Sequence, residues 1–323
     1  MTGDRFVAVP ANTSAVSELA ALTPANPFAT SSFFESMRRD GLASWVLGLS
    51  DATGRLACGC AAFVKSGRLN SSLEIPSLPG IGAESAFWPG LRAFCREQGV
   101  SQLALGTFAS PGGVEIPPLG QHCIRRSRCE FVLDLGGELT AKLSTNHKRN
   151  VKKGQKVGLV IRQTRTSDAA IIHTALMGLS MVRRRSRGES VGSVSPASAD
   201  VAVLQSGAGE LFQAVADATV LSSVLVLRAP EGGYYQSAGT SPDGMAVGAS
   251  QFLIHGIAKQ LKADGARVFN LGGADVESSL ATFKEGFGAS KVPLPSANCY
   301  VGSTWRRWAS QGLARLLPSR GAS

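Results

Sequence analysis

The residues of this chain that are best suited to chemistry lie between Tyr234 and Gly288. A strand-like run at the start of this stretch leads into a loop of small residues, and an apolar helix follows. The first turn of a helix carries unpaired N–H donors and the positive end of the helix dipole, so it can hold a phosphate or an acyl carbonyl. The alternative is a purely structural turn. The pattern predicts a donor-binding loop made of Gly244, Val247, Gly248, Ala249 and Ser250.

A second candidate is Lys284, which lies between Phe283 and Phe287 in the run ATFKEGFG. Attack of an amine on an ester or thioester needs a proton acceptor and positive charge near the developing oxyanion. A lysine held in this setting could supply that charge, and this is the role that the family resemblance described below implies. The competing interpretation is an ordinary surface lysine.

The proton acceptor is less well defined by the sequence. Asp275 and Glu277 follow the second strand of the stretch, but acidic residues in such a loop are more often helix caps. His147 and His255 are weaker candidates, because a lone histidine on a helix is usually structural. Neither histidine has a cysteine or carboxylate at metal-ligand spacing, and no metal site is expected.

The net charge of the chain is +10, and the positive residues are clustered. Such an excess favours a polyanionic partner: a nucleotide diphosphate, coenzyme A, tRNA or an anionic lipid surface. The alternative for any one cluster is a solvated face that keeps the protein soluble. The four clusters are Arg125, Arg126 and Arg128; Lys142, Lys148, Arg149, Lys152, Lys153 and Lys156; Arg183, Arg184, Arg185 and Arg187; and Arg306 with Arg307.

Cysteine usage and hydropathy favour a cytosolic protein. The six cysteines form no C-x-x-C pair and no disulfide framework, so we expect reduced thiols. The N-terminus lacks the pattern of a signal peptide. The longest apolar run, 169–182, is too short to cross a bilayer, and we expect it to be a helix that buries Ile171, Ile172, Leu176 and Leu179.

The order of predicted strands and helices occurs twice along the chain. Adding 166 to each number from Gly41 to Gly106 gives thirteen identities in sixty-six positions, where chance would give about five. The identities fall at turns and helix ends, where the backbone often needs a conformation that glycine adopts more readily than other residues. We therefore predict two copies of one α/β domain, with Gly82 and Gly248 at equivalent helix starts.

The chain also resembles a known family, the Fem-type branch of the GNAT acyltransferase superfamily. The resemblance covers nearly the whole chain and rests on the order of four stretches. These are FATSSFFESMR, LSTNHKRNVKKGQKVGL, YYQSAGTSPDGMAVGASQFLIHGIAKQLKADGARVFNLGG and ATFKEGFG. The last is similar to the family's aromatic–Lys–x–x–Phe–Gly motif, and Arg38 and Arg149–Asn150 fall at the basic positions of the first two.

This resemblance implies an α/β fold with two tandem GNAT-like domains, each a mixed, mostly antiparallel sheet flanked by helices. We expect the first domain at 1–134, the second at 135–300 with a basic N-terminal helix, and a basic tail at 301–323. Lys284 would be catalytic. The acceptor would be held by Arg38, Arg149, Asn150, Phe283 and Phe287.

The implied activity is transfer of an acyl or aminoacyl group to an amine of a cell-envelope precursor of peptidoglycan or exopolysaccharide. Acyl-CoA or aminoacyl-tRNA would be the co-substrate, with no tightly bound cofactor, and the acceptor would carry a nucleotide or lipid diphosphate. The protein would be cytoplasmic, with peripheral contact at the inner face of the membrane as an option. The loop GMAVG lacks the Gln or Arg that usually leads the pyrophosphate loop, and no coiled-coil arm for tRNA is present. The alternative is therefore a non-catalytic GNAT-fold module that binds a polyanion or a membrane surface.

Overall fold

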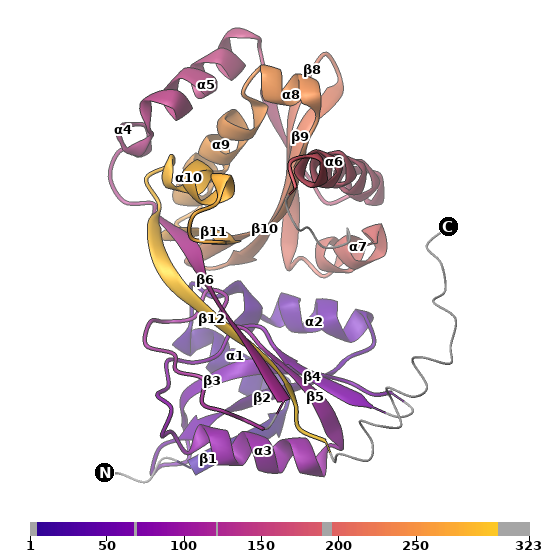
Figure 1. The fold of residues 1–323 in the computed structure, drawn as a ribbon, viewed down its shortest axis with the longest axis vertical. Helices are drawn as coiled ribbons and strands as arrows, with labels where there is room; N and C mark the ends of the chain where they lie inside the picture. The colour runs from indigo at the N-terminus through magenta and orange to yellow at the C-terminus, as the bar shows by residue number, and fades with distance from the viewer. Residues whose placement is uncertain (1–4, 68–69, 121, 189–195, 303–323) are drawn as a thin grey trace. The chain divides into compact units, whose positions relative to one another are not determined.

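The computed structural model describes residues 5–67, 70–120, 122–188 and 196–302. The contacts divide the chain into two compact units (Figure 1). Within the described residues, unit 1 contains 5–22, 41–127 and 295–302, and unit 2 contains 23–40 and 128–294. Residues 23–40 thus pack with the second unit, although they precede most of the first in sequence. The fourth basic cluster, Arg306 and Arg307, and most of the tail at 301–323 lie outside the described residues.

Unit 1 is built on a mixed sheet in the order β1-β2-β3-β4-β5-β12, in which β4 and β5 are parallel. Its apolar core includes Leu73, Phe87 and Leu103. Its strands are β1 (Arg5–Pro10), β2 (Ala43–Ser50), β3 (Leu56–Lys65), β4 (Ser71–Ile75), β5 (Val100–Leu105) and the end of β12 (Ser290–Tyr300), and its helices are α1 (Thr13–Leu22) and α3 (Phe87–Glu97).

Unit 2 repeats this plan in the order β6-β11-β10-β9-β8-β7, with β10 and β11 parallel. Its strands are β6 (His122–Asp134), β7 (Val160–Thr164), β8 (Gly209–Ala216), β9 (Thr219–Ala229), β10 (Gly232–Thr240) and β11 (Val268–Ala274). Its longer helices are α2 (Ser31–Arg39), α5 (Thr145–Lys156), α6 (Ser167–Ser186), α7 (Ala197–Gln205) and α9 (Ala249–Ala263), and its shorter ones are η1 (Pro27–Ala29), α4 (Leu139–Lys142), α8 (Pro242–Ala246) and α10 (Ser279–Glu285).

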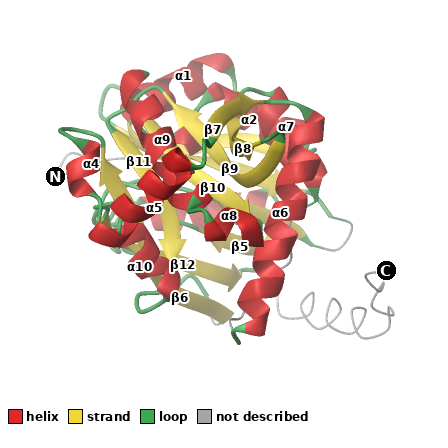
Figure 2. Ribbon diagram, turned by 90° about the horizontal axis from the view of Figure 1, so that it is seen from above, coloured by secondary structure: helices red, strands yellow, loops and turns green. Residues whose placement is uncertain are grey.

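The helices of unit 2 cover both faces of its sheet. Helices α5 and α9 lie on one face, and α6 and α7 lie on the other (Figures 1 and 2). The core between α9 and the sheet is apolar, with Leu253, Ile257, Phe212 and Phe269 buried. This arrangement confirms the predicted fold class, a mixed and mostly antiparallel sheet flanked by helices.

The repeat predicted from the sequence holds for the order of the elements, but the two equivalent helices α3 and α9 do not begin at equivalent positions. Gly248 directly precedes α9 and has a left-handed backbone with φ of 74°. Gly82 lies in a loop, and α3 begins only at Phe87, after Ala86. The two glycines are therefore not at equivalent helix starts. Helices α3 and α9 end at matching positions, Glu97 and Ala263, but α3 has 11 residues and α9 has 15, so α3 begins later.

The prediction for the helix at 169–182 was partly wrong. Helix α6 buries Leu176, but Ile171, Ile172 and Leu179 are exposed. Its inner face instead combines small and polar residues, such as Ala170 and His173, with Leu176 and Met177. His173 is fully buried, and its Nδ1 and Nε2 each lie 2.9 Å from a serine Oγ, on Ser223 and Ser237.

The two units differ at their pair of parallel strands. In unit 2, β10 pairs with β11 only over Gly232–Tyr234 and Val268–Asn270, and both strands then change register. Beyond that point β10 pairs with β9 and β11 pairs with β6, so the two parallel strands part from one another. We call this opening the splay; there the two strand edges no longer pair with each other, and backbone groups on such edges can hydrogen-bond to a ligand.

Unit 1 shows no such opening among its described residues. There β4 and β5 stay paired from Ser71 and Val100 to Ile75 and Leu105. Backbone hydrogen bonds continue past the strand ends, from Gly106 N to Ile75 O at 2.8 Å and from Leu78 N to Gly106 O at 3.0 Å. The splay is thus a property of unit 2, and it makes unit 2 the better candidate for binding a donor.

Candidate functional site

Lys284 lies at the splay of unit 2. It is in α10, its side chain is almost completely buried with 4% exposed, and its Nζ donates a 2.9 Å hydrogen bond to Gly273 O at the end of β11. A Cβ built at Gly272 would lie 3.7 Å from Nζ and 3.0 Å from Tyr235 O. The ammonium therefore lies where β10 and β11 part, and Lys284 is not a surface lysine.

Burial controls the charge of Lys284. Desolvation lowers its pKa to about 7, with Arg128 and Arg184 acting in the same direction and the carboxylate of Glu130 opposing them. The Nζ atom also lies 5.7 Å from the centre of the Tyr235 ring and 5.8 Å from that of Phe131. A lysine in this state can stabilise negative charge when protonated and can accept a proton when neutral.

A buried polar network lies beside the lysine. Glu130 in β6 is 2% exposed, and its Oε2 accepts a 2.8 Å hydrogen bond from Asn270 Nδ2. Asn270 Oδ1 accepts in turn from Gly272 N at 2.8 Å, which fixes the backbone at the splay. The hydroxyl of Tyr234 hydrogen-bonds to Glu130, and burial raises the pKa of Tyr234 well above its usual value. A buried carboxylate needs such partners, and Glu130 of β6 finds them on β11 and β10.

This network was missed by the sequence analysis, which proposed Asp275 and Glu277 as bases. Both lie exposed in the loop between β11 and α10. Asp275 Oδ1 forms a 3.2 Å ion pair with Arg128 Nε, so it orients that arginine. Glu130 gave no sequence signal beyond a single acidic residue before an apolar run, since its partner Asn270 is 140 residues away.

The aromatic residues of the ATFKEGFG motif hold α10 in place. Phe287 is buried, and the ring of His147 lies 4.4 Å from it, centre to centre, and 5.3 Å from Phe283. His147 Nε2 is 2.9 Å from Phe283 O, and a Cβ at Gly286 would lie 2.4 Å from the same imidazole. These contacts clamp α5 against α10. His147 therefore packs against the two phenylalanines, and Phe283 and Phe287 help to position Lys284.

The contacts of His255 are also those of a packing residue. It lies in α9, is buried, and its Nε2 is 3.5 Å from Thr140 Oγ1. Burial lowers the pKa of His255, and the nearby Lys259 adds to this effect. This imidazole lies on the side of α9 that meets α4 and is not among the contacts of the splay.

The predicted donor loop forms the end of α8 and the start of α9. Gly244 lies in α8, Val247 follows that helix, and Gly248 is the N-cap of α9 with no side-chain cap among the described residues. The first turn of α9 therefore begins at Ala249 with backbone N–H groups that no side chain caps. Ser250 Oγ is 2.8 Å from Thr240 Oγ1, which ties this turn to the end of β10 beyond the splay.

Gly248 has a packing role in addition to any ligand contact. A Cβ at this position would lie 2.6 Å from Asn150 O and 2.9 Å from Asn150 Cβ. Asn150 thus packs α5 against the start of α9. Substitution of Gly248 would disturb this contact and the left-handed backbone as well as ligand approach, so it cannot separate binding from folding.

The predicted acceptor arginines are not gathered at one point. Arg149 is exposed on α5, and its Nη2 donates to Asn146 Oδ1 at 3.0 Å. Arg38 is at the end of α2, 55% exposed, with a 3.0 Å ion pair to Glu35. Figure 1 shows α5 beside α9, whereas α2 contacts α7 on the other face of the sheet. Arg128 and Arg184 are closer to Lys284, and their positive charges lower its pKa.

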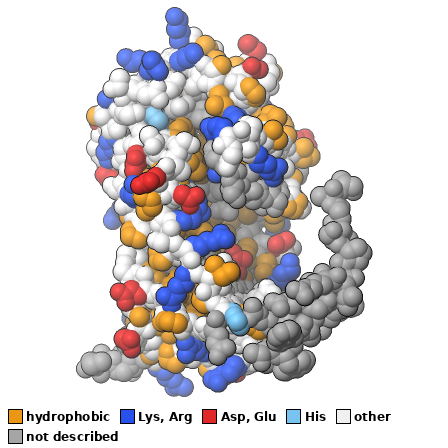
Figure 3. Space-filling view, in the orientation of Figure 1, with side chains coloured by type: hydrophobic (Ala, Val, Ile, Leu, Met, Phe, Trp, Pro, Cys, Tyr) orange, Lys and Arg blue, Asp and Glu red, His pale blue; other side chains and the backbone are white. Residues whose placement is uncertain are grey.

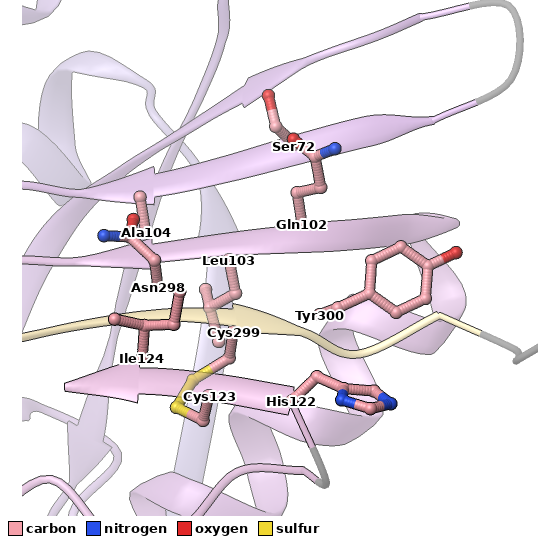
Figure 4. Close-up of a pocket in the computed structure, with 10 residues that line it drawn as sticks. All are labelled: Ser72, Gln102, Leu103, Ala104, His122, Cys123, Ile124, Asn298, Cys299 and Tyr300. Atoms are coloured by element: carbon pink, nitrogen blue, oxygen red, sulfur yellow. A yellow bond between two sulfur atoms is a disulfide. The ribbon is translucent and has the colours of Figure 1, made fainter. Parts of the chain in front are cut away.

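Unit 1 contains a pocket of about 550 Å³ that holds none of the predicted site residues (Figure 4). It is lined by neighbouring strands at Ser72, Gln102, Leu103, Ala104, His122, Cys123, Ile124, Asn298, Cys299 and Tyr300. Cys123 and Cys299 face each other across β6 and β12 with their Cα atoms 4.0 Å apart, and they form a disulfide. The expectation that all six cysteines are reduced is therefore wrong for this pair, which sequence spacing could not bring together.

No helix in the part of the chain that the structure describes combines the length and the hydropathy needed to cross a membrane.

Comparison with known proteins identifies the fold of the unit that holds Lys284. Residues 141–285 match the model of the acetyltransferase (GNAT) domain. No curated protein matches the sequence. Among solved structures, FemX is similar over 96% of this chain and 99% of its own, with a TM-score of 0.63 and 11% identity.

Two further structures share the fold. A tandem GNAT protein from the clavulanic acid biosynthesis pathway covers 93% of this chain and 100% of its own, with a TM-score of 0.55 and 13% identity. The C-terminal domain of a protein assigned as a lysylphosphatidylglycerol synthetase, from Agrobacterium fabrum, covers 97% of this chain and 98% of its own, with a TM-score of 0.51 and 17% identity. These likenesses support the tandem, Fem-like GNAT architecture expected from the sequence.

Proposed function

We propose that this protein, a GNAT acyltransferase with a Fem-like tandem fold, transfers an acyl or aminoacyl group to an amine at the splay of unit 2. The observation that carries this proposal is the position of Lys284. Its buried ammonium lies where two parallel strands part, at the backbone of Gly272 and Gly273. A buried lysine is costly to a fold, and its retention beside an opening is typical of a functional site.

The proposed reaction uses the two edges of the splay. The acyl carbonyl of the donor enters the opening, and the acceptor amine attacks its carbon to form a tetrahedral oxyanion. The Lys284 ammonium stabilises that charge. Collapse of the intermediate breaks the bond to the carrier, and the proton released by the amine passes to the carrier, which leaves as a thiol or an alcohol. Glu130 holds Asn270 and Tyr234 in place and favours the charged form of Lys284.

The donor is proposed to be acyl-CoA or an aminoacyl-tRNA. Both carry phosphates, which the first turn of α9 can accept without a side-chain cap. The exposed cationic face of α5 adjoins that turn through the contact of Asn150 with Gly248. A non-catalytic module that binds such polyanions is the competing function, and it predicts binding without turnover.

The acceptor is proposed to be a cell-envelope precursor that carries a nucleotide or lipid diphosphate. The support is the clustered positive charge, together with the likeness in fold to a domain assigned to lysylphosphatidylglycerol synthesis. The protein would work in the cytoplasm or at the inner face of the membrane. Mass spectrometry of small molecules that co-purify with it, followed by calorimetric titration with acetyl-coenzyme A, would test both substrates.

Neutralisation of Arg149 or Arg38 is expected to act on acceptor binding. Because the two arginines lie on opposite faces of the sheet, only one of Arg149→Ala and Arg38→Ala should raise the acceptor KM several-fold. Its kcat should change little, because a phosphate contact remote from the amine acts equally on ground and transition states. The KM of the parent should also rise with salt. Steady-state kinetics at several salt concentrations would measure these changes in KM. Arg267→Ala is the control, because Arg267 is exposed and paired with Glu231. An acceptor KM unchanged by salt and by both substitutions would remove the diphosphate from the proposal.

A further inference from the structure

Helix α6 has apolar side chains on the face that points away from the sheet. Ile171, Leu179 and Val182 are 61%, 48% and 63% exposed, and Ile172 is 38% exposed. Together with Ala175 they are spaced by three and four residues, so they share one side of the helix. We call these five residues the α6 stripe. The opposite side, with His173, Leu176 and Met177, is buried against the sheet.

Arginines border the α6 stripe at both ends. Arg165, which is paired with Glu210 at 3.4 Å, precedes the helix, and Arg185 follows Val182 on the exposed side at the other end. In the space-filling view, hydrophobic side chains and Lys or Arg side chains lie next to each other on the surface of unit 2 where α6 is found (Figure 3). Asp168 is the acidic residue of the first turn. An aliphatic face with cationic ends is the pattern of a helix that lies in the interface of an anionic bilayer.

We propose that the α6 stripe docks on the surface of an anionic membrane. Its aliphatic side chains enter the headgroup boundary, and Arg185 contacts lipid phosphates. The inference deepens the proposed function, on which it rests for the need to reach a lipid-linked acceptor. Two arginines of the same helix have contacts toward the reaction site. Arg183 Nη1 donates to Thr240 O at 3.3 Å, and the charge of Arg184 lowers the pKa of Lys284. One helix would thus face the bilayer on one side and the reaction site on the other.

A second copy of the chain fits this face less well. Four partly exposed aliphatic side chains offer less than the roughly 800 Å² per partner that a stable interface needs. An antiparallel pair of α6 helices would bring the basic end of each against the first turn of the other. There only Asp168 is acidic, so most of the arginine charge would stay unpaired.

Co-sedimentation with lipid vesicles tests the proposal without any measurement of turnover. The full chain would be mixed with vesicles of phosphatidylcholine or of an equimolar mixture with phosphatidylglycerol. We expect binding to the anionic vesicles, weakened by salt. The double substitution Leu179→Ser and Val182→Ser should weaken this binding about tenfold or more, because it removes the apolar contribution. Arg185→Gln should weaken binding to anionic vesicles by a smaller factor.

The matched control is Val157→Ser, which changes another exposed aliphatic residue of unit 2, 47% exposed, at the end of α5. It should bind like the parent. Transfer from acetyl-coenzyme A to a water-soluble amine should be unchanged in the double variant, so loss of docking and loss of catalysis can be told apart. The proposal is overturned if anionic vesicles are not bound, or if the double variant binds them like the parent. It is also overturned if light scattering shows a dimer of the parent that the double variant disperses.

Discussion

Replacement of Lys284 by methionine is expected to reduce kcat by about two orders of magnitude or more while making the fold more stable. Preorganised positive charge at a developing oxyanion contributes roughly 3 kcal/mol, which corresponds to this loss. Acceptor binding should survive, because this charge acts mainly in the transition state. Lys284→Arg should restore only part of the activity, since a planar guanidinium cannot replace a compact ammonium in a buried site.

The gain in stability follows from the lowered pKa of Lys284, about 7 in the folded state against 10.5 in the ordinary lysine. Between these values the unfolded chain binds more protons than the folded chain, so the stability of the parent rises with pH over this window. Below it, the burial of the charged lysine costs a few kcal/mol, at about 1.4 kcal/mol per pKa unit. The stability advantage of Lys284→Met should therefore be largest near pH 6 and shrink toward pH 10.

Thermal unfolding and steady-state kinetics of the same samples would measure both effects. Lys291→Met is a suitable control, because Lys291 is exposed and paired with Glu285 at 3.1 Å in the same unit. It should change neither kcat nor the pH dependence of stability. Parental turnover in Lys284→Met would end the catalytic interpretation and favour the binding-module alternative.

The second large effect concerns pH. If the reaction needs the charged form of Lys284, kcat should fall as pH rises through about 7, by about tenfold for each further pH unit. If neutral Lys284 instead accepted the proton of the amine, kcat would rise over the same range. The proposed oxyanion role predicts the fall.

Two substitutions should shift the pH at which kcat falls, and they should shift it in opposite directions. The carboxylate of Glu130 raises the pKa of Lys284, so Glu130→Gln should shift the fall to lower pH. Arg128 lowers the same pKa, so Arg128→Gln should shift it to higher pH. A general loss of structure would reduce activity at every pH without shifting the fall. Shifts of the same sign in both variants would contradict the assignment of the fall to Lys284.

The sequence was informative where chemistry and backbone geometry are local. The loop at Gly248 could be located because a glycine before a helix is visible within a few positions, and Lys284 could be located because ATFKEGFG resembles a family motif. The network of Glu130 with Asn270 could not, because each is an unremarkable polar residue until the sheet pairs β6 with β11.

The orientation of α6 shows a different limit. Apolar residues occur on both sides of this helix, so periodicity alone does not tell which side packs. In the structure, the side of α6 that faces Gly239 of β10 is the one that packs on the sheet. A Cβ built at Gly239 would lie 2.2 Å from the backbone of Leu176. This close approach puts His173 inside and leaves Ile171 and Val182 outside.

Hydrogen–deuterium exchange in the presence of the donor tests the central claim most directly. Acetyl-coenzyme A and total aminoacylated tRNA would be added separately to the parent protein, and amide protection would be followed in both units. The account predicts that one of the two donors protects the splay and the loop at 235–250 and 270–274, and leaves β4 and β5 of unit 1 unchanged. Protection of β4 and β5 instead, or no protection of the splay by either donor, would contradict it.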